Sequence, residues 1–164
     1  MSDRAKKIFE YHNFSKHRLD SYAPGSGELD WANQPNPYRE YIGSEKIELP
    51  LLENLDQFPS YSTISRVPAE KKSVTKVTIA NLLELSFGLA AIKDFNGNQW
   101  ALRVNPSSGN LHPTESYLIT KGLPGLSGGV YHYHSKDHSL RKRMEATGPF
   151  LEGIGNDCYI ALTS

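Results

Sequence analysis

The pattern of apolar and polar residues predicts four β-strands in the second half of the chain. Residues 98–104 alternate Trp100, Leu102 and Val104 with other side chains, as a half-buried strand does, directly after the tight-turn pair Asn96-Gly97. The other strand candidates are residues 115–120, 129–134 and 157–163, each bounded by Gly, Pro, Ser or Asn. The pattern therefore predicts a sheet.

A helical period precedes these strands. Thr78 can cap a helix whose apolar residues extend over more than one face, which is typical of a helix that is mostly buried. The apolar residues are Ile79, Leu82, Leu83, Leu85, Leu89 and Ile92. A shorter helix is predicted over residues 3–16, with Ser2 as a weak N-cap. Helices packed on a sheet indicate the α+β fold class.

Residues 19–62 show no sustained period and form a Pro-rich arm. Prolines and aromatic residues recur along the arm, whereas flexible linkers are usually rich in Gly, Ser or charge, so we expect the arm to be docked on a surface. The predicted division is an N-terminal helix and arm at residues 1–62 and a folded domain at residues 63–164. An apolar strand that reaches Ser164 predicts a sheet truncated at its C-terminus, or completed by a second copy.

Composition limits the possible partners and the compartment. The 164 residues contain 18 Lys and Arg against 18 Asp and Glu, so no net charge attracts nucleic acid or an anionic membrane. Cys158 is the single cysteine, the first residues lack the apolar run of a signal peptide, and no window resembles a membrane span. We expect a cytoplasmic protein with neither nucleic-acid nor membrane partners.

The densest polar segment, residues 103–113 (RVNPSSGNLHP), joins two predicted strands. Ser107 can cap a single helical turn there, directing the next three amides outward toward electron-rich or anionic atoms. Gly109 would let a flat ligand approach, and the Asn110 amide can both donate and accept hydrogen bonds. A flavin or nucleotide has these requirements. Taken alone, however, the loop favours a polar connector with Arg103 as a solvated strand residue.

Several motifs together resemble one family. RVNPSSGNLHPTESYLI at residues 103–119 is similar to the flavin-contacting segment of the nitroreductase-like superfamily, and more closely to its SagB-type dehydrogenase branch, which includes azoline oxidases. That branch also has a Gly-Val-Tyr-His-Tyr run and a His-x-Leu run, as in residues 129–133 and 138–140. LLELSFGL at residues 82–89 and QPNPY at residues 34–38 match it as well. The resemblance spans almost the whole chain.

The resemblance implies an FMN-dependent oxidoreductase with a nitroreductase-like fold that passes hydride through flavin N5. It implies a homodimer with FMN at the interface, and hydride supplied by NAD(P)H or by a small-molecule or peptide substrate. The FMN contacts that it implies are Arg103, Pro106, Ser107, Ser108 and Asn110, with Gly109 permitting close approach. Arg103 would face the N1 and C2-oxygen side of the flavin. No catalytic acid or base is assigned.

The sequence departs from the family at the phosphate. Nitroreductases usually bind the FMN phosphate with an Arg-x-Ser-x-Arg run, whereas here only Ser65-Arg66 stands near that place, followed by Lys71 and Lys72. A second function therefore stays open, namely a truncated, non-catalytic flavin-fold module that packs against a partner.

Three other interpretations are weaker. His132, His134 and His138 with Asp137 could bind a metal, but their pattern favours a solvated strand face and a turn, so we expect no metal site. Ser107 or Ser108 with His112 lacks the Gly-x-Ser-x-Gly elbow of a hydrolase. Cys158 lies in an apolar strand and is expected to be a core residue.

Overall fold

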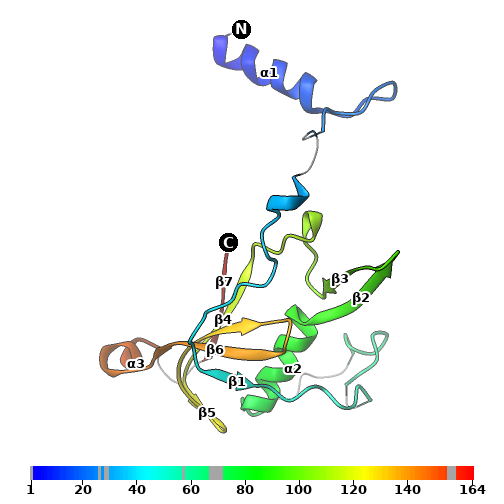
Figure 1. Ribbon diagram of the computed structural model, residues 1–164. Coiled ribbons are helices and arrows are strands. Elements are labelled where there is room, and N and C mark those ends of the chain that lie inside the picture. Colours follow the sequence, from blue (N-terminus) through cyan, green and yellow to red (C-terminus); the bar gives the residue numbers. More distant parts are fainter. Residues whose placement is uncertain (1, 26, 28–29, 57, 67–71, 155–157) are drawn as a thin grey trace. The chain divides into compact units, whose positions relative to one another are not determined.

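The computed structural model describes residues 2–25, 27, 30–56, 58–66, 72–154 and 158–164 (Figure 1). Contacts divide the chain into two units, Met1–Pro35 and Asn36–Ser164. The division of the chain into residues 1–62 and 63–164 stays a prediction. Lys71 and Asp157, which were assigned to the phosphate region and to the last strand, lie outside the described residues.

The first unit contains the predicted short helix, α1 (Asp3–Ser15), and a 3-10 turn, η1 (Trp31–Asn33). Ser2 is the N-cap of α1, as expected, and its hydroxyl accepts a hydrogen bond from the Ala5 amide at 3.3 Å. Between these elements the His17 and Tyr22 rings meet edge to face at 5.7 Å.

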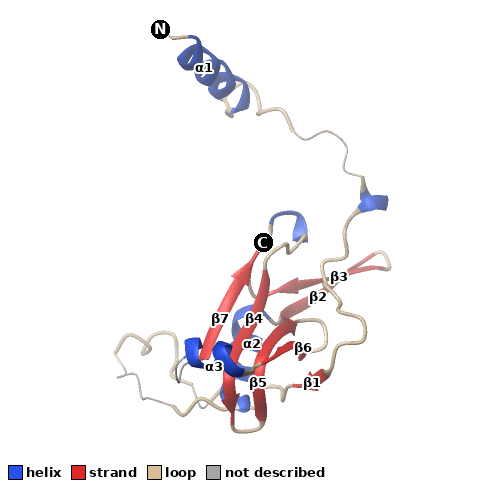
Figure 2. Ribbon diagram, turned by 90° about the vertical axis from the view of Figure 1, so that its left-hand side faces the viewer, coloured by secondary structure: helices blue, strands red, loops and turns tan. Residues whose placement is uncertain are grey.

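The second unit is built on a five-stranded sheet with the strand order β1-β6-β5-β4-β7 (Figures 1 and 2). All neighbours are antiparallel. The strands are β1 (Lys46–Glu48), β4 (Glu115–Leu123), β5 (Leu126–His134), β6 (Ser139–Glu145) and β7 (Cys158–Thr163). A short helix, α3 (Gly148–Ile154), joins β6 to β7. The mixed α and β architecture and the strands at 115–120, 129–134 and 158–163 are confirmed.

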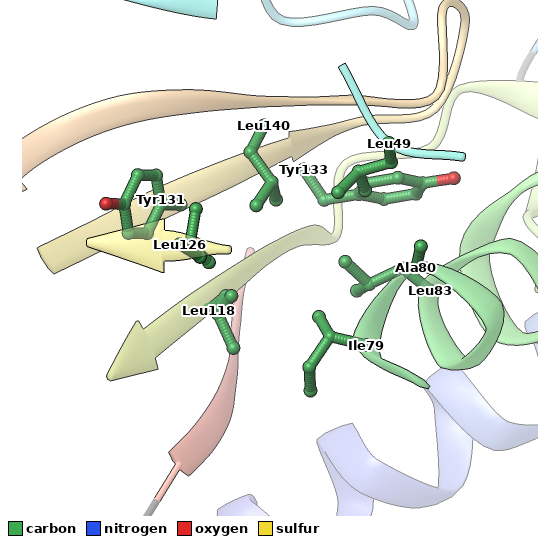
Figure 3. Close-up of a cluster of buried hydrophobic side chains, with 9 residues drawn as sticks. All are labelled: Leu49, Ile79, Ala80, Leu83, Leu118, Leu126, Tyr131, Tyr133 and Leu140. Atoms are coloured by element: carbon green, nitrogen blue, oxygen red, sulfur yellow. The ribbon is translucent and has the colours of Figure 1, made fainter. Parts of the chain in front are cut away.

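The helix α2 (Lys76–Phe87) covers one face of the sheet and supplies much of the core. Its buried residues Ile79, Ala80 and Leu83 pack against the sheet residues Leu118, Leu126, Tyr131, Tyr133 and Leu140, with Leu49 closing one side (Figure 3). Leu83 and Leu118 are fully buried. Cys158 packs at the edge of this core, as expected, and burial raises the pKa of its thiol.

The predicted helix is shorter than its apolar pattern suggested. Thr75, rather than Thr78, is the N-cap, and Thr78 returns a side-chain hydrogen bond to it as the third residue of a capping box. The helix ends before Gly88, where a Cβ atom would lie 2.5 Å from the Glu84 carbonyl oxygen. The expectation that helix continued to Ile92 is therefore wrong, because a strand begins at Leu89.

That strand, β2 (Leu89–Phe95), forms a hairpin with β3 (Asn98–Arg103), which confirms the strand expected at 98–104. Asn96 and Gly97 have φ angles of 52° and 80°, as a turn with two left-handed residues requires. The hairpin is a sheet of its own, and it is partly buried only where β2 begins, at Leu89, and where β3 ends, from Ala101 to Arg103. Arg103 thus stands at the end of the hairpin that approaches the core.

Candidate functional site

The polar loop between β3 and β4 has an unusual backbone. Gly109, Asn110 and His112 all have left-handed φ angles, of 64°, 56° and 48°. Glycine adopts this region freely and asparagine tolerates it, but for histidine it carries a conformational cost. The loop contains the 3-10 turn η2 (Ser108–Asn110), where a single helical turn was expected. Strained residues of this kind are kept only where surrounding contacts hold them.

Hydrogen bonds inside the loop supply that support. The Ser107 hydroxyl accepts from the His112 amide at 2.9 Å, and Asn110 Nδ2 donates to the Ala101 carbonyl at 2.9 Å. Asn110 Oδ1 accepts from His112 Nε2 at 2.7 Å, which places the His112 proton on Nε2 because an amide oxygen can only accept. Ser107 is the N-cap residue of η2, but its side chain makes no capping hydrogen bond. Its hydroxyl instead binds the His112 amide, which follows η2.

His112 is the buried centre of these contacts. It is 4% exposed, and its Nδ1 has no partner among the described residues. Burial, and next the positive charge of Arg103, lower the pKa of His112, while Glu115 raises it in part. A neutral His112 whose Nε2 is committed to Asn110 does not activate Ser107, so the loop lacks the geometry of a hydrolase pair.

Arg103 is half-buried rather than solvated, which corrects the connector interpretation. Its guanidinium donates to the Pro37 carbonyl oxygen and lies 5.1 Å from the centre of the Tyr38 ring. The Arg103 Nε is buried and has no partner among the described residues. Burial lowers the pKa of Arg103, and the nearby Glu115 carboxylate opposes that change. A buried guanidinium N–H without a partner is an available donor next to the loop.

The other predicted contacts are placed in different ways. Pro106, Ser108 and Gly109 are exposed at the tip of the loop, whereas Ser107 and Asn110 are partly buried and engaged within it. A Cβ atom at Gly109 would make only an ordinary contact with Leu111, so the left-handed backbone is the reason for glycine there. The side-chain amide of Asn110 positions the loop, and its expected contact with a ligand stays a prediction.

Sequence reasoning missed a buried network beside the loop. Glu115, the first residue of β4, accepts from or pairs with His132 Nε2 at 2.6 Å, and both side chains are buried. The rings of Tyr41 and Tyr117 lie 5.1 and 5.2 Å from the His132 ring, and their hydroxyls are 2.7 Å apart. The Arg143 guanidinium carbon lies over the Tyr41 ring, 3.7 Å from its centre. This network connects the arm, the sheet and the loop.

The three histidines of β5 and its turn are therefore not on a solvated face, and that expectation is wrong. His132 is covered by Tyr41, and His134 lies 6.1 Å from the Tyr38 ring and hydrogen bonds Asp137 at 2.7 Å. Within the predicted arm, Tyr38 and Tyr41 pack against alternate residues of β5, whereas Tyr61 is exposed, so docking of the arm as a whole stays a prediction. Among the described residues, no three His, Cys, Asp or Glu side chains gather as a metal site.

Of the residues considered for phosphate binding, the structure describes Ser65, Arg66 and Lys72. Ser65 and Arg66 are exposed in a turn, and Lys72 Nζ lies 5.3 Å from the centre of the Phe58 ring.

Among the described residues, no helix is long and apolar enough to cross a membrane.

Comparison with solved structures matches this architecture to a crystal structure of a "putative nitroreductase" from Anabaena variabilis. The TM-score is 0.55 with 32% sequence identity, over 84% of this chain and 26% of that one. The fold is nitroreductase-like. The chain spans about a quarter of the length of this structural relative. No family model matches the sequence, and no curated protein matches it.

Proposed function

We propose that this chain forms the flavin-contacting part of an FMN-dependent oxidoreductase of the SagB-type dehydrogenase kind. The observation that carries the proposal is the buried, unpartnered Nε of Arg103 beside a strained loop, in a nitroreductase-like fold. The relative of 32% identity supports an oxidoreductase. The parent activity, its substrate and its assembly are part of the proposal, because the chain covers 26% of that relative.

The residues of the loop fit the heterocycle of a flavin better than its phosphate. Arg103 offers a charged donor for the N1 and C2-oxygen side of the ring, where negative charge develops on reduction. Pro106, Ser108 and Gly109 are exposed and can contact a flat ligand. Ser107 and Asn110 hold the backbone in place through their bonds to His112 and Ala101. We assign the phosphate to none of the described residues.

Bound FMN would supply hydride transfer at its N5, with NAD(P)H or a small-molecule or peptide substrate as the donor. The chain's own contribution is to orient the ring and to supply charge near it. The Glu115 carboxylate, hydrogen bonded to His132, stabilises the positive charge of Arg103, because its Coulombic interaction raises the pKa of Arg103. It acts on the pKa of His112 in the same direction. We further propose a homodimer as the assembly that encloses the flavin, since the loop tip is exposed in this chain.

An FMN titration of the purified chain tests the proposal. Absorbance from about 350 to 500 nm and the melting temperature are recorded with and without excess FMN, since a ligand that binds the folded state raises its stability. Arg103→Lys keeps the charge but loses the planar donor, and we expect at least roughly tenfold weaker FMN binding from a lost charged hydrogen bond. Lys93→Ala, on the exposed part of β2, is the control and should bind like the parent.

Equal FMN affinity in the Arg103→Lys variant and the parent would remove Arg103 from the site. A parent chain that stays colourless, and whose melting temperature ignores FMN, would favour the non-catalytic interaction module instead.

A further inference from the structure

A separate pocket opens between β1, α2 and the turn that follows β5. Its volume is about 420 Å³, within the range of small-molecule sites. Leucine side chains form its apolar wall, and ionisable or hydroxylic side chains form the rest. The lining residues used below are Leu51, Leu89, Glu84, Tyr133, Ser135 and His138. None of them belongs to the loop of residues 103–110 to which the flavin is assigned.

Tyr133 and His138 form a polarised pair at this pocket. Nε2 of His138 lies 3.1 Å from the Pro50 carbonyl oxygen, which can only accept, so Nε2 donates this hydrogen bond. His138 Nδ1 then accepts from the Tyr133 hydroxyl at 2.8 Å. Because the Tyr133 proton is committed to His138, its oxygen presents lone pairs to any further partner.

Glu84 adds a carboxylate that has no Lys or Arg partner among the described residues. Its Oε2 accepts from the Leu52 amide at 2.8 Å and lies 3.7 Å from His138 Nε2. Among the described residues, Glu84 has no Lys or Arg within ion-pair distance, whereas Asp137 nearby pairs with both Lys46 and Arg141. A partly buried carboxylate without a cationic partner attracts a cation.

Two more features indicate that the pocket is prepared for a ligand. Ser135 is 6% exposed, lines the pocket, and its hydroxyl has no hydrogen-bond partner among the described residues. His138 keeps a left-handed φ of 46°, a strained conformation for a residue other than glycine. Lys136 also lines the pocket, but its ammonium lies 5.7 Å from the Tyr38 ring centre, which provides it with another partner.

We propose that this pocket binds a small primary alkylammonium ion. The ammonium group would donate to the Glu84 carboxylate and to the lone pairs of Tyr133, and the Ser135 hydroxyl would gain the partner that it lacks. Leu51 and Leu89 provide an apolar wall for the alkyl chain. The ligand thus matches the acceptors, the charge and the apolar wall together, whereas an anion would meet Glu84.

The test uses n-butylammonium chloride, titrated into the whole chain without FMN and followed by calorimetry and by amide NMR shifts. We expect saturable binding of n-butylammonium, with shifts at residues around Glu84 and His138. The affinity for n-butanol, which lacks the charge, should be lower by a factor of roughly ten or more. Sodium butyrate should not bind. Equal binding of n-butanol and n-butylammonium, or no binding of either, would overturn the proposal.

Two variants and a control assign the site. Glu84→Gln keeps an acceptor for the Leu52 amide but loses the charge, and should weaken n-butylammonium binding roughly 10- to 100-fold. Tyr133→Phe keeps the ring in the core and should weaken binding by a smaller factor, so it tests the site even if Glu84→Gln does not fold. Glu145→Gln removes an exposed carboxylate elsewhere on the sheet and should leave the dissociation constant unchanged. Unchanged binding in a folded Glu84→Gln or Tyr133→Phe variant would contradict the assignment. Because no flavin is present, this outcome is independent of the flavin titration.

Discussion

Replacement of Ser107 by alanine tests how the polar loop is held. The Ser107 hydroxyl accepts a hydrogen bond from the His112 amide at 2.9 Å, and His112 is 4% exposed. Ser107→Ala leaves that buried amide without an acceptor, because water cannot easily reach it. An unsatisfied buried donor costs about 1–3 kcal/mol of unfolding free energy. At this chain length the cost corresponds to a fall in melting temperature of about 2–4 °C for each kcal/mol.

The assay is thermal and urea unfolding of the parent chain and of three variants at position 107 or 108. Ser107→Thr keeps the hydroxyl and should retain most of the stability, which separates the hydrogen bond from the general effect of substitution. Ser108 is exposed in the same turn, so Ser108→Ala should change the unfolding free energy by no more than about 0.5 kcal/mol. If Ser107→Ala and Ser108→Ala unfold alike, the bond to His112 does not support the loop, and the reasoning is refuted.

Two further predictions concern the core and a buried carboxylate. Leu83→Ala should lower the unfolding free energy by about 2–5 kcal/mol because Leu83 is fully buried. Leu82 is 47% exposed, so Leu82→Ala should lower it by about 1 kcal/mol. Similar losses for the two variants in urea unfolding would mean that α2 presents a different face to the sheet. Burial by itself would raise the pKa of Asp137, but hydrogen bonds from Ser139, His134 and Lys46 outweigh it and lower that pKa well below the ordinary value of 3.8. Its contribution to stability is therefore complete above about pH 4 and is lost as the pH falls further, so the parent should lose more stability than Asp137→Asn between pH 5 and pH 2, and parallel acid-unfolding curves would contradict this.

The sequence predicted the elements whose periodicity is strong. The strand at 98–104 alternates clearly, those at 115–120 and 129–134 are bounded by turn residues, and Asn96-Gly97 indicated its turn correctly. The end of the helix could not be predicted from hydrophobicity, because Leu89 and Ile92 continue the apolar run into β2, where Leu89 is partly buried and Ile92 is exposed. The signal lay in Gly88, whose missing Cβ avoids the Glu84 carbonyl.

β6 was missed for a different reason. Its central residues, Arg141, Lys142 and Arg143, are all basic, which is typical of a solvated face. In the structure Lys142 pairs with Glu45 and Arg143 lies over Tyr41, so two of these charges have partners from a distant part of the chain. Such pairing depends on contacts between distant residues, which no local pattern contains.

The candidate site could be predicted in part. Residues 103–110 were found from their composition and from the family resemblance, and the structure places residues 104–110 in the loop that follows Arg103, the last residue of β3. The orientation of the Ser107 and Asn110 side chains was not predictable, because both side chains bind His112. In the sequence, His112 is one polar loop residue among several. The sequence predicts Glu115 only as the first residue of a strand. Its role as the partner of His132 follows from the pairing of β4 with β5, which brings the two side chains together.

The contacts that close the sheet join residues far apart in the chain. Tyr41 and Tyr117 are separated by 76 positions, and Pro50 and His138 by 88. The β4–β5 and β5–β6 pairs, in contrast, are hairpins of neighbouring strands. Contacts between distant residues slow folding because a long loop must close before they form. We therefore expect the hairpins to form early and the segment around Tyr41 and Pro50 to dock late, so that nascent chains pass through a stage in which the histidines of β5 are still uncovered.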